Sequence, residues 1–507
     1  MERPIRGKMS KRSSVCKVRE RRTVLRALSV LPLATACFAT EPDLFHPIRE
    51  EIAKAILSGK ATGVAVAVVH RGRIIWEEGF GWANREAGLR ATPHTPFSLA
   101  SISKPFTTTL LTVLAADGRL SLDEAANAYL GDLSLRGVGA DNVTIRELGA
   151  HASGLPSLFE MYPTDGSLSP PTPDAILRAY GTLAYPAGQI YEYSNIGYAA
   201  IGVIASRLTK MDFGRLITSR LLMPLGLRDS FFATDASHLK RAAARYDEME
   251  QSIPYYTTAT PPSGELYASA HDLAQFALFN LKGHTIAGRP VLDEHWLDEL
   301  HKPVLRGPAA GATTFGWFSG RGAAGIPVLF KDGGQPGVST VLYLVPSESL
   351  ACLVLTNRSD NGDLAQILVD RMIAAVIPSW TTPDTRMDPP GTPFVPTSDY
   401  LGQWTGRLSG GGADMRVRLN LDAESSTLSL DEAPAQAVTD LQLAGSALTG
   451  KTIGRINAPD AIRAAATLLR FKLLRETRSL DGRLLASASG PGRLATIPFV
   501  IRLARTP

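Results

Sequence analysis

The side chains best suited to chemistry begin with Ser101 and Lys104, three positions apart at the start of a stretch with helical spacing. Positions i and i+3 share one face of a helix, so the lysine amine can approach the serine hydroxyl. A desolvated amine with a lowered pKa can take the proton of a hydroxyl and make it a nucleophile. The start of the helix adds free N–H groups for an oxyanion. The spacing favours acyl transfer, although alone it also fits an N-cap serine and a surface lysine.

A second candidate group is Tyr193-Ser-Asn195, which follows a turn at 186–188 and precedes another helical stretch. A tyrosinate is a strong base, but its ordinary pKa of about 10 requires nearby cations, and Lys104 is a candidate for one. Asn195 can donate to a substrate carbonyl and accept from Lys104. Taken alone, the group also fits a core tyrosine and an N-cap asparagine.

The third group, Lys331-Asp-Gly-Gly334, ends the predicted strand 328–330. Gly333 and Gly334 allow a ligand to approach the backbone closely. The N–H of Gly334 can complete an oxyanion hole with that of Ser101, and Lys331 supplies a cation for a substrate carboxylate or for Tyr193. Taken alone, the group also fits a β-turn with a solvated lysine.

The elements between these groups suggest how they meet. Residues 64–76 read as a β-hairpin, residues 120–310 are mostly helix and loop, and strand patterns return at 315–318, 328–330, 340–345 and 350–355. A helix over 101–117 is expected to stop at Gly118, and another helix spans 364–377. We therefore predict one sheet built from distant segments, with a helical insertion beside it.

Together, in this order, the three groups resemble the class C β-lactamase branch of the penicillin-binding-protein-like serine hydrolases. That branch includes esterases, D-aminopeptidases and DD-peptidases. The resemblance covers about residues 45–378, and we assign residues 44–378 to this domain. Its supporting segments are Phe97–Phe106, Gly118–Asp123, His151–Pro156, Tyr193–Tyr198, Pro224–Leu227 and Gly333–Gly337.

The resemblance implies a β-lactamase/transpeptidase-like fold, an α/β (α+β) sandwich with an antiparallel sheet and an all-helical lobe. It also implies an acyl-enzyme mechanism in which Ser101 attacks while Lys104 and Tyr193 move protons. Which of the two is the base stays open. Substrate-binding or oxyanion roles fall to Asn195, Lys331, Gly333 and Gly334.

No cofactor is expected. No Cys/His cluster has the spacing of metal ligands, so no metal site is predicted either. The lone cysteine of the body, Cys352, lies in an apolar run and is predicted to be a core residue.

One position departs from the family pattern. β-Lactamases usually carry threonine after the lysine of the third group, where its hydroxyl helps to hold the substrate carboxylate, and this chain has Asp332. An aspartate facing the site would oppose a carboxylate and partly cancel Lys331. We therefore rank hydrolysis of esters or peptide-like amides above β-lactam hydrolysis. A peptidoglycan-binding or sensor protein without turnover is the further alternative.

The basic character of the chain, with net charge +5, is concentrated in residues 1–39. The remainder carries no basic excess, which argues against a nucleic-acid partner. The basic stretch precedes an apolar run at 27–39, too short to span a bilayer, and predicts an export signal and a periplasmic or secreted protein. Arg21-Arg22 resembles a twin-arginine signal, and lipidation of Cys37 would anchor the protein to a membrane. A basic N-terminus on a cytosolic protein is the alternative.

The last part of the chain begins with a proline-rich linker, residues 379–397, expected to be extended and not to pack. Residues 398–507 show strand-like alternation, and the amphipathic stretch 463–474 fits a helix or a strand. The opening Tyr400-Leu-Gly-Gln-Trp404 resembles a lipocalin-like extension, so we predict a β-rich, barrel-like accessory domain. It shows no catalytic constellation.

Overall fold

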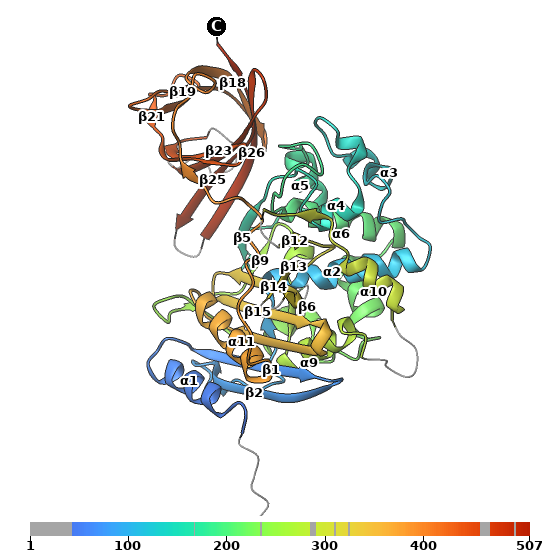
Figure 1. Ribbon diagram of the computed structural model, residues 1–507. Coiled ribbons are helices and arrows are strands. Elements are labelled where there is room, and N and C mark those ends of the chain that lie inside the picture. The colour runs from blue at the N-terminus through green and yellow to red at the C-terminus, as the bar shows by residue number, and fades with distance from the viewer. Residues whose placement is uncertain are drawn as a thin grey trace, which may run out of the picture. The chain divides into compact units, whose positions relative to one another are not determined.

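Two segments far apart in the sequence form the centre of one antiparallel sheet. β1 (Gly63–His70) pairs with β2 (Arg73–Asn84) on one side and with β16 (Leu350–Thr356) on the other. The other strands are β3 (Leu89–Arg90), β11 (Leu305–Arg306), β12 (Ala312–Thr313), β13 (Phe318–Arg321), β14 (Pro327–Gln335) and β15 (Val338–Val345). Their order is β11-β12-β13-β14-β15-β16-β1-β2-β3. The prediction of one sheet built from distant segments is confirmed (Figure 1).

This computed structural model describes residues 43–166, 168–233, 236–283, 291–308, 311–322, 325–456, 467–490 and 493–506. The predicted export signal, with Arg21, Arg22 and Cys37, lies outside the described residues. Residues from Leu44 onward form one compact unit. Among the described helices, none combines the length and the apolar character that a membrane span needs.

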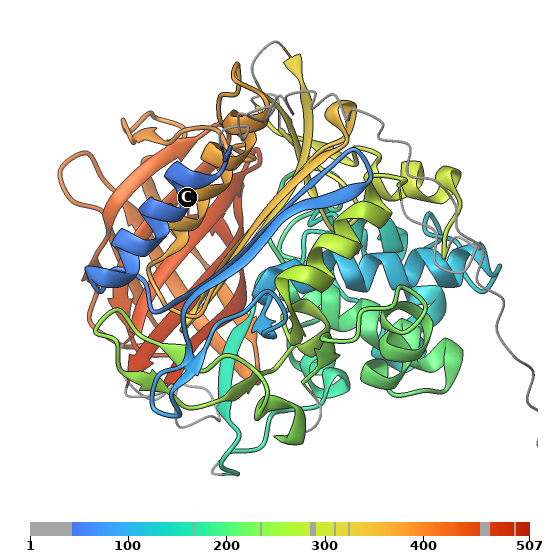
Figure 2. The same ribbon diagram turned by 90° about the horizontal axis from the view of Figure 1, so that it is seen from below.

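β1 is buried on both faces, which explains why its sequence is an unbroken apolar run. Val64, Val66 and Val68 enter a core shared with α1 (His46–Leu57) and α11 (Gly362–Val376). Ala65 and Ala67 enter the larger core, on the side of α9 (Ala270–Asn280). Helices therefore cover both faces of the sheet (Figure 2). Cys352 is buried within β16, as predicted.

The helical lobe is organised around α2 (Ser103–Ala116), in which every residue from Ser103 to Ala115 is buried. A 3₁₀ turn over 100–102 precedes it, so the α-helix begins two residues later than predicted. Gly118, at φ +71°, follows the end of the helix as expected. The other described helices are α3 (Asn127–Leu130), α4 (Ile145–Gly149), α5 (Pro173–Tyr180), α6 (Asn195–Thr209), α7 (Phe213–Ile217), α8 (Ala236–Leu239) and α10 (Glu294–His301).

Short strands lie between β3 and β11 in the sequence, and none of them belongs to the main sheet. They are β4 (Phe97–Ser98), β5 (Phe159–Pro163), β6 (Phe231–Phe232), β7 (Arg245–Tyr246), β8 (Ser252–Ile253), β9 (Tyr256–Thr258) and β10 (Leu266–Ala268). β10 pairs with both β4 and β6, which fixes the segment that leads into the 3₁₀ turn.

The C-terminal strands form a second antiparallel sheet that curls into a barrel-like ring (Figure 1). They are β17 (Thr392–Pro393), β18 (Gly402–Gly410), β19 (Ala413–Leu421), β20 (Thr427–Leu430), β21 (Gln436–Ala437), β22 (Thr439–Ala444), β23 (Ala447–Gly454), β24 (Thr467–Arg475), β25 (Ser479–Gly490) and β26 (Arg493–Arg505). Buried and exposed residues alternate along β19. The predicted fold class, with a β-rich accessory domain, is confirmed. The described part of the ambiguous stretch 463–474 is strand.

The proline-rich segment packs, contrary to the expectation from its composition. Trp380 is buried, and its indole N–H donates to Asp370 at 2.8 Å. Asp388 accepts from Lys472 at 2.9 Å, and Thr392 and Pro393 pair with β22. Prolines keep the backbone extended, but the side chains between them are free to make contacts along a surface.

The C-terminal sheet is attached to the first part of the protein beside the segment that carries Tyr193. β26 pairs with β5, Thr496 opposite Phe159. The buried carboxylate of Glu192 accepts from Arg483 at 2.6 Å and lies 3.6 Å from the Lys472 amine. A carboxylate removed from water requires such partners.

We expect Arg483→Ala to lower the free energy of unfolding by up to about 3 kcal/mol, because it leaves Glu192 buried with only the more distant Lys472. Arg407→Ala is the matched control on the same sheet, since Arg407 pairs with Asp414 at the exposed surface, where an ion pair contributes little to stability. Denaturant unfolding of the three proteins makes the comparison. Equal losses in the two variants would contradict a stabilising role for the buried pair.

Candidate active site

Ser101 sits in the 3₁₀ turn between β4 and α2, directly after a strained residue. Ala100 has φ +46°, a left-handed conformation that non-glycine residues seldom adopt. β14 passes unusually close to this turn. A Cβ on Gly333 would lie 2.3 Å from the carbonyl oxygen of Leu99 and 3.1 Å from the Ser101 nitrogen. Gly333 therefore permits the close packing of strand and turn, and it is Gly334 that lines the adjoining cleft.

Lys104 brings its amine to the serine from the first turn of α2. Its Nζ lies 3.1 Å from Ser101 Oγ and donates to the Ser263 carbonyl at 2.9 Å. The side chain is fully buried. Burial and, to a smaller extent, the charge of Lys331 hold the pKa of Lys104 well below its ordinary value. No feature of the sequence predicted this hydrogen bond from Lys104 to the Ser263 carbonyl.

Tyr193 also contacts the serine, with its phenolic oxygen 2.6 Å from Ser101 Oγ. It lies just before α6, whose N-cap Ser194 accepts from the N–H of Gly197. The Lys104 amine lies over the Tyr193 ring, 4.8 Å from its centroid. Burial raises the pKa of the Tyr193 phenol, so the phenol keeps its proton at neutral pH.

His151 supports Tyr193 and does not touch Ser101. Its ring stacks on the Tyr193 ring with centroids 4.2 Å apart, and its Nδ1 accepts the N–H of Ser194 at 3.0 Å. Burial, Lys331 and Lys104 lower the pKa of His151, which keeps the ring neutral and able to accept. His151 is therefore a positioning residue.

The side-chain amide of Asn195 makes one hydrogen bond within the protein and keeps its oxygen free of one among the described residues. Its Nδ2 donates to the Leu158 carbonyl at 2.9 Å, while its buried Oδ1 has no hydrogen-bond partner among the described residues. The expected hydrogen bond from Lys104 to Asn195 is replaced by the one to Ser263. Because Asn195 lines the cleft, its free oxygen can accept an N–H group from a ligand.

Lys331 and Asp332 place opposite charges at the same wall. The Lys331 side chain is 2% exposed, with its amine 4.3 Å from the Phe318 ring centroid and 5.2 Å from that of Tyr193. The Asp332 side chain is 65% exposed, yet its carboxylate lies 3.9 Å from the Lys331 amine, and Asp332 also lines the cleft. Burial lowers the pKa of Lys331, and Asp332 opposes that shift.

All seven predicted site residues come together around one cleft of about 500 Å³. Five of them line the cleft, and Lys104 contacts Ser101 from behind the cleft wall. Gly333 packs against the 3₁₀ turn that carries Ser101. Two further residues of the wall, Leu485 and Thr496, come from the C-terminal sheet. Nothing in the residue pattern of that sheet predicted its place at the cleft. The cleft is lined by Ser101, Ser157, Phe159, Tyr191, Tyr193, Asn195, Thr258, Ser263, Phe318, Lys331, Asp332, Gly334, Gln335, Leu485 and Thr496.

Several known proteins are similar to this chain in sequence or in fold. Protein flp of Staphylococcus aureus strain COL is 25% identical over 329 residues, 63% of this chain and 64% of its own length. A class C β-lactamase superposes with TM-score 0.57 at 20% identity, over 65% of this chain and 96% of that one. The structure of SurE with D-Leu superposes with TM-score 0.63 at 20% identity, over 90% of this chain and 99% of that one.

The match to a family model is the most direct of these findings. The model described as Beta-lactamase matches residues 43–376, well over half of the chain and close to the predicted boundaries 44–378. The resemblance inferred from the three groups of residues is thereby confirmed, and the chain belongs to the Beta-lactamase family.

Proposed function

We propose that the protein is a serine hydrolase that acts through an acyl-enzyme on esters or peptide-like amides. One observation carries the proposal. A single hydroxyl, Ser101 Oγ, lies within hydrogen-bond distance of both the Lys104 amine and the Tyr193 phenol. A nucleophile with a base on one side and a proton donor on the other is the arrangement that acyl transfer needs.

We assign the role of base to Lys104. Its lowered pKa leaves a fraction of neutral amine to accept the Ser101 proton as Oγ bonds to the substrate carbonyl carbon. The N–H groups of Ser101 and Gly334 would stabilise the resulting oxyanion. Collapse expels the leaving group, which takes the proton held by Lys104, either directly or through the Tyr193 hydroxyl. Water then attacks the acyl-enzyme and gives a proton to Lys104, and Ser101 Oγ takes that proton back as the acid is released. Lys104 and Tyr193 share protons with one hydroxyl, so their titrations are coupled.

β-Lactam hydrolysis is the alternative, supported by family membership and by the buried cation of Lys331. Asp332 weighs against it, because its carboxylate lies 3.9 Å from that cation at the cleft wall. Esters and neutral amides avoid this conflict. The similarity to the structure of SurE with D-Leu makes D-amino-acid amides a worthwhile substrate to test.

The proposed setting is the periplasm or the exterior of the cell, which rests on the basic and apolar leader. Peptidoglycan peptides are then a candidate source of acyl substrates, and we propose no nucleic-acid partner. Membrane anchoring would require lipidation of Cys37. A sensor that is acylated but does not turn over would share the same site, and it is separated from the hydrolase below.

We expect the exported form of the protein to hydrolyse p-nitrophenyl acetate or butyrate and Ser101→Ala to lose this activity by at least about 10³-fold, because the nucleophile is removed. A fluorophosphonate probe should label the wild type and not the variant. A fluorescent penicillin bound to Ser101 should be released if the protein is a hydrolase and retained if it is a sensor. Ester hydrolysis that persists in Ser101→Ala would eliminate the proposed nucleophile.

The charge of Asp332 should set the preference between neutral and carboxylate-bearing substrates. We expect Asp332→Thr to raise kcat/KM for nitrocefin relative to p-nitrophenyl acetate by about 5- to 10-fold, as one close repulsion is removed. Asp332→Asn, which removes the charge without adding the threonine hydroxyl, is the matched control. An unchanged ratio in both variants would show that Asp332 does not act on the substrate carboxylate.

The rate at which a neutral fluorophosphonate labels Ser101 should rise with pH through the pKa of Lys104, because only the neutral amine accepts the proton. Asp332 raises the pKa of Lys104 and Lys331 lowers it. Asp332→Asn should therefore move the rise to lower pH, and Lys331→Met should move it to higher pH. Shifts of the same sign in both variants would argue against Lys104 as the base.

A further inference from the structure

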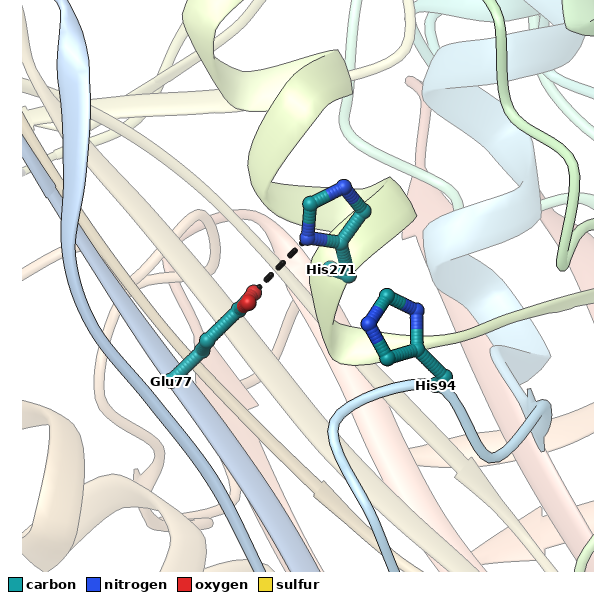
Figure 3. Close-up of side chains that lie close together, drawn as sticks. All are labelled: Glu77, His94 and His271. Carbon is teal, nitrogen blue, oxygen red and sulfur yellow. Dashed lines mark hydrogen bonds and ion pairs between the residues drawn. The ribbon is translucent and has the colours of Figure 1, made fainter.

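Outside the cleft, three metal-ligating side chains converge from three separate segments. Glu77 lies on β2, His94 in the loop before β4, and His271 in the first turn of α9. One ligand atom from each lies within 4.8 Å of the other two. Figure 3 shows the three side chains facing a common point, with His271 bonded to Glu77. None of them lines the Ser101 cleft.

The two histidines present different ring nitrogens to the cluster. The Nδ1 of His271 lies 2.9 Å from the Glu77 carboxylate, so it is itself the nitrogen that a shared ion would bind. The Nδ1 of His94 lies 2.9 Å from the carboxylate of Asp229, and its other nitrogen, Nε2, is turned toward Glu77 in Figure 3. A carboxylate that accepts from one histidine nitrogen fixes the tautomer and orients the other nitrogen as a metal ligand, which is what Asp229 does for His94.

The surroundings carry more negative than positive charge. Glu77 and Asp229 each pair with a histidine, and among the described residues neither has a Lys or Arg within 4 Å. A further carboxylate, Asp272, accepts from the N–H of Asp229 and from the Ser230 hydroxyl, both at 2.7 Å. A divalent cation between Glu77 and the two histidines would balance this charge.

We propose that Glu77, His94 and His271 bind a divalent transition metal ion, with Zn²⁺ the best fit to two imidazoles and one carboxylate. The cation would replace the proton now shared between His271 Nδ1 and Glu77. Two ligands about 2.0 Å from a tetrahedral zinc lie about 3.3 Å apart, so the 2.9 Å contact needs to open only slightly. The partial exposure of the cluster leaves the fourth position to water.

The ion would join β2, α9 and the loop that leads to the nucleophile. His94 stands three residues before β4, and Ser101 follows β4 within the next turn. The loop is already tied to α9 by the N–H of His271, which donates to the Pro93 carbonyl at 3.1 Å. A metal at this place strengthens an existing connection, so its role is structural and is independent of the proposed hydrolase activity.

The test uses the full protein without a histidine tag, stripped with a chelator and titrated with Zn²⁺ in a calorimeter. We expect one Zn²⁺ per chain, no comparable binding of Mg²⁺, and a thermal midpoint that rises with Zn²⁺ concentration. His94→Ala and His271→Ala should each weaken binding by at least about 10-fold. Asp229→Asn should weaken it by about 10- to 100-fold.

His295→Ala is the matched control, because His295 is exposed on α10 and does not belong to the cluster. It should bind Zn²⁺ as the wild type does. Equal affinities for the wild type and the His94→Ala/His271→Ala double variant would overturn the proposal. Co²⁺ added to the wild type gives a readout that does not depend on how the variants fold: visible absorption bands of a low-coordinate nitrogen and oxygen site support the proposal, and their absence overturns it.

Discussion

The burial of the Lys104 amine is the constraint on which the site depends. An ammonium with no exposed surface loses its hydration, and among the described residues no carboxylate lies within 4 Å to compensate. The structure offers a carbonyl, Ser263, and the faces of two aromatic rings, Tyr193 and Tyr198. These groups stabilise an ammonium less well than water does, so the pKa of Lys104 falls and the neutral amine is favoured. In the proposed mechanism, Lys104 can act as a base because it is packed in the core of the lobe, so the packing of α2 bears directly on that mechanism.

The same region stores backbone strain in a defined way. A left-handed Ala100 costs about 1–2 kcal/mol, and it persists because both neighbours are held. Leu99 donates its N–H to Leu266 on β10, and Gly333 on β14 lies against the other side of the turn. Any side chain at position 333 would collide with the Leu99 carbonyl. The position of Ser101 thus depends on two contacts of the turn, one with β10 of the small sheet and one with β14 of the main sheet.

The parts of the fold and of the candidate site that follow from local residue patterns and from the order of the motifs could be predicted from the sequence. Ser101, Lys104, Tyr193 and Lys331 could be placed together because the three groups, in this order, resemble one family, while the apolar runs at both ends of the domain predicted one sheet. Contacts made by backbone carbonyls, such as that of Ser263, left no trace in residue type. The predicted strand 315–318 illustrates a different limit. Its apolar residues form a turn at Gly316, φ +98°, and the strand starts only at Phe318. Burial of Phe315 and Trp317 in the lobe, not strand pairing, explains that apolar pattern.

The C-terminal sheet shows how a domain without catalytic groups can still shape a reaction. Glu192 immediately precedes Tyr193, and its buried carboxylate is neutralised by Arg483 and Lys472 of that sheet. Tyr185, in the same part of the lobe, donates to the Lys472 carbonyl at 2.7 Å. The strand that supplies Leu485 to the cleft also supplies Arg483, so the residue that lines the cleft and the residue that pairs with Glu192 are two positions apart. Strand alternation on β25 places them on the same face. Changes at Leu485 or Thr496 can therefore alter the shape of the cleft while Lys104 and Tyr193 keep their contacts with Ser101.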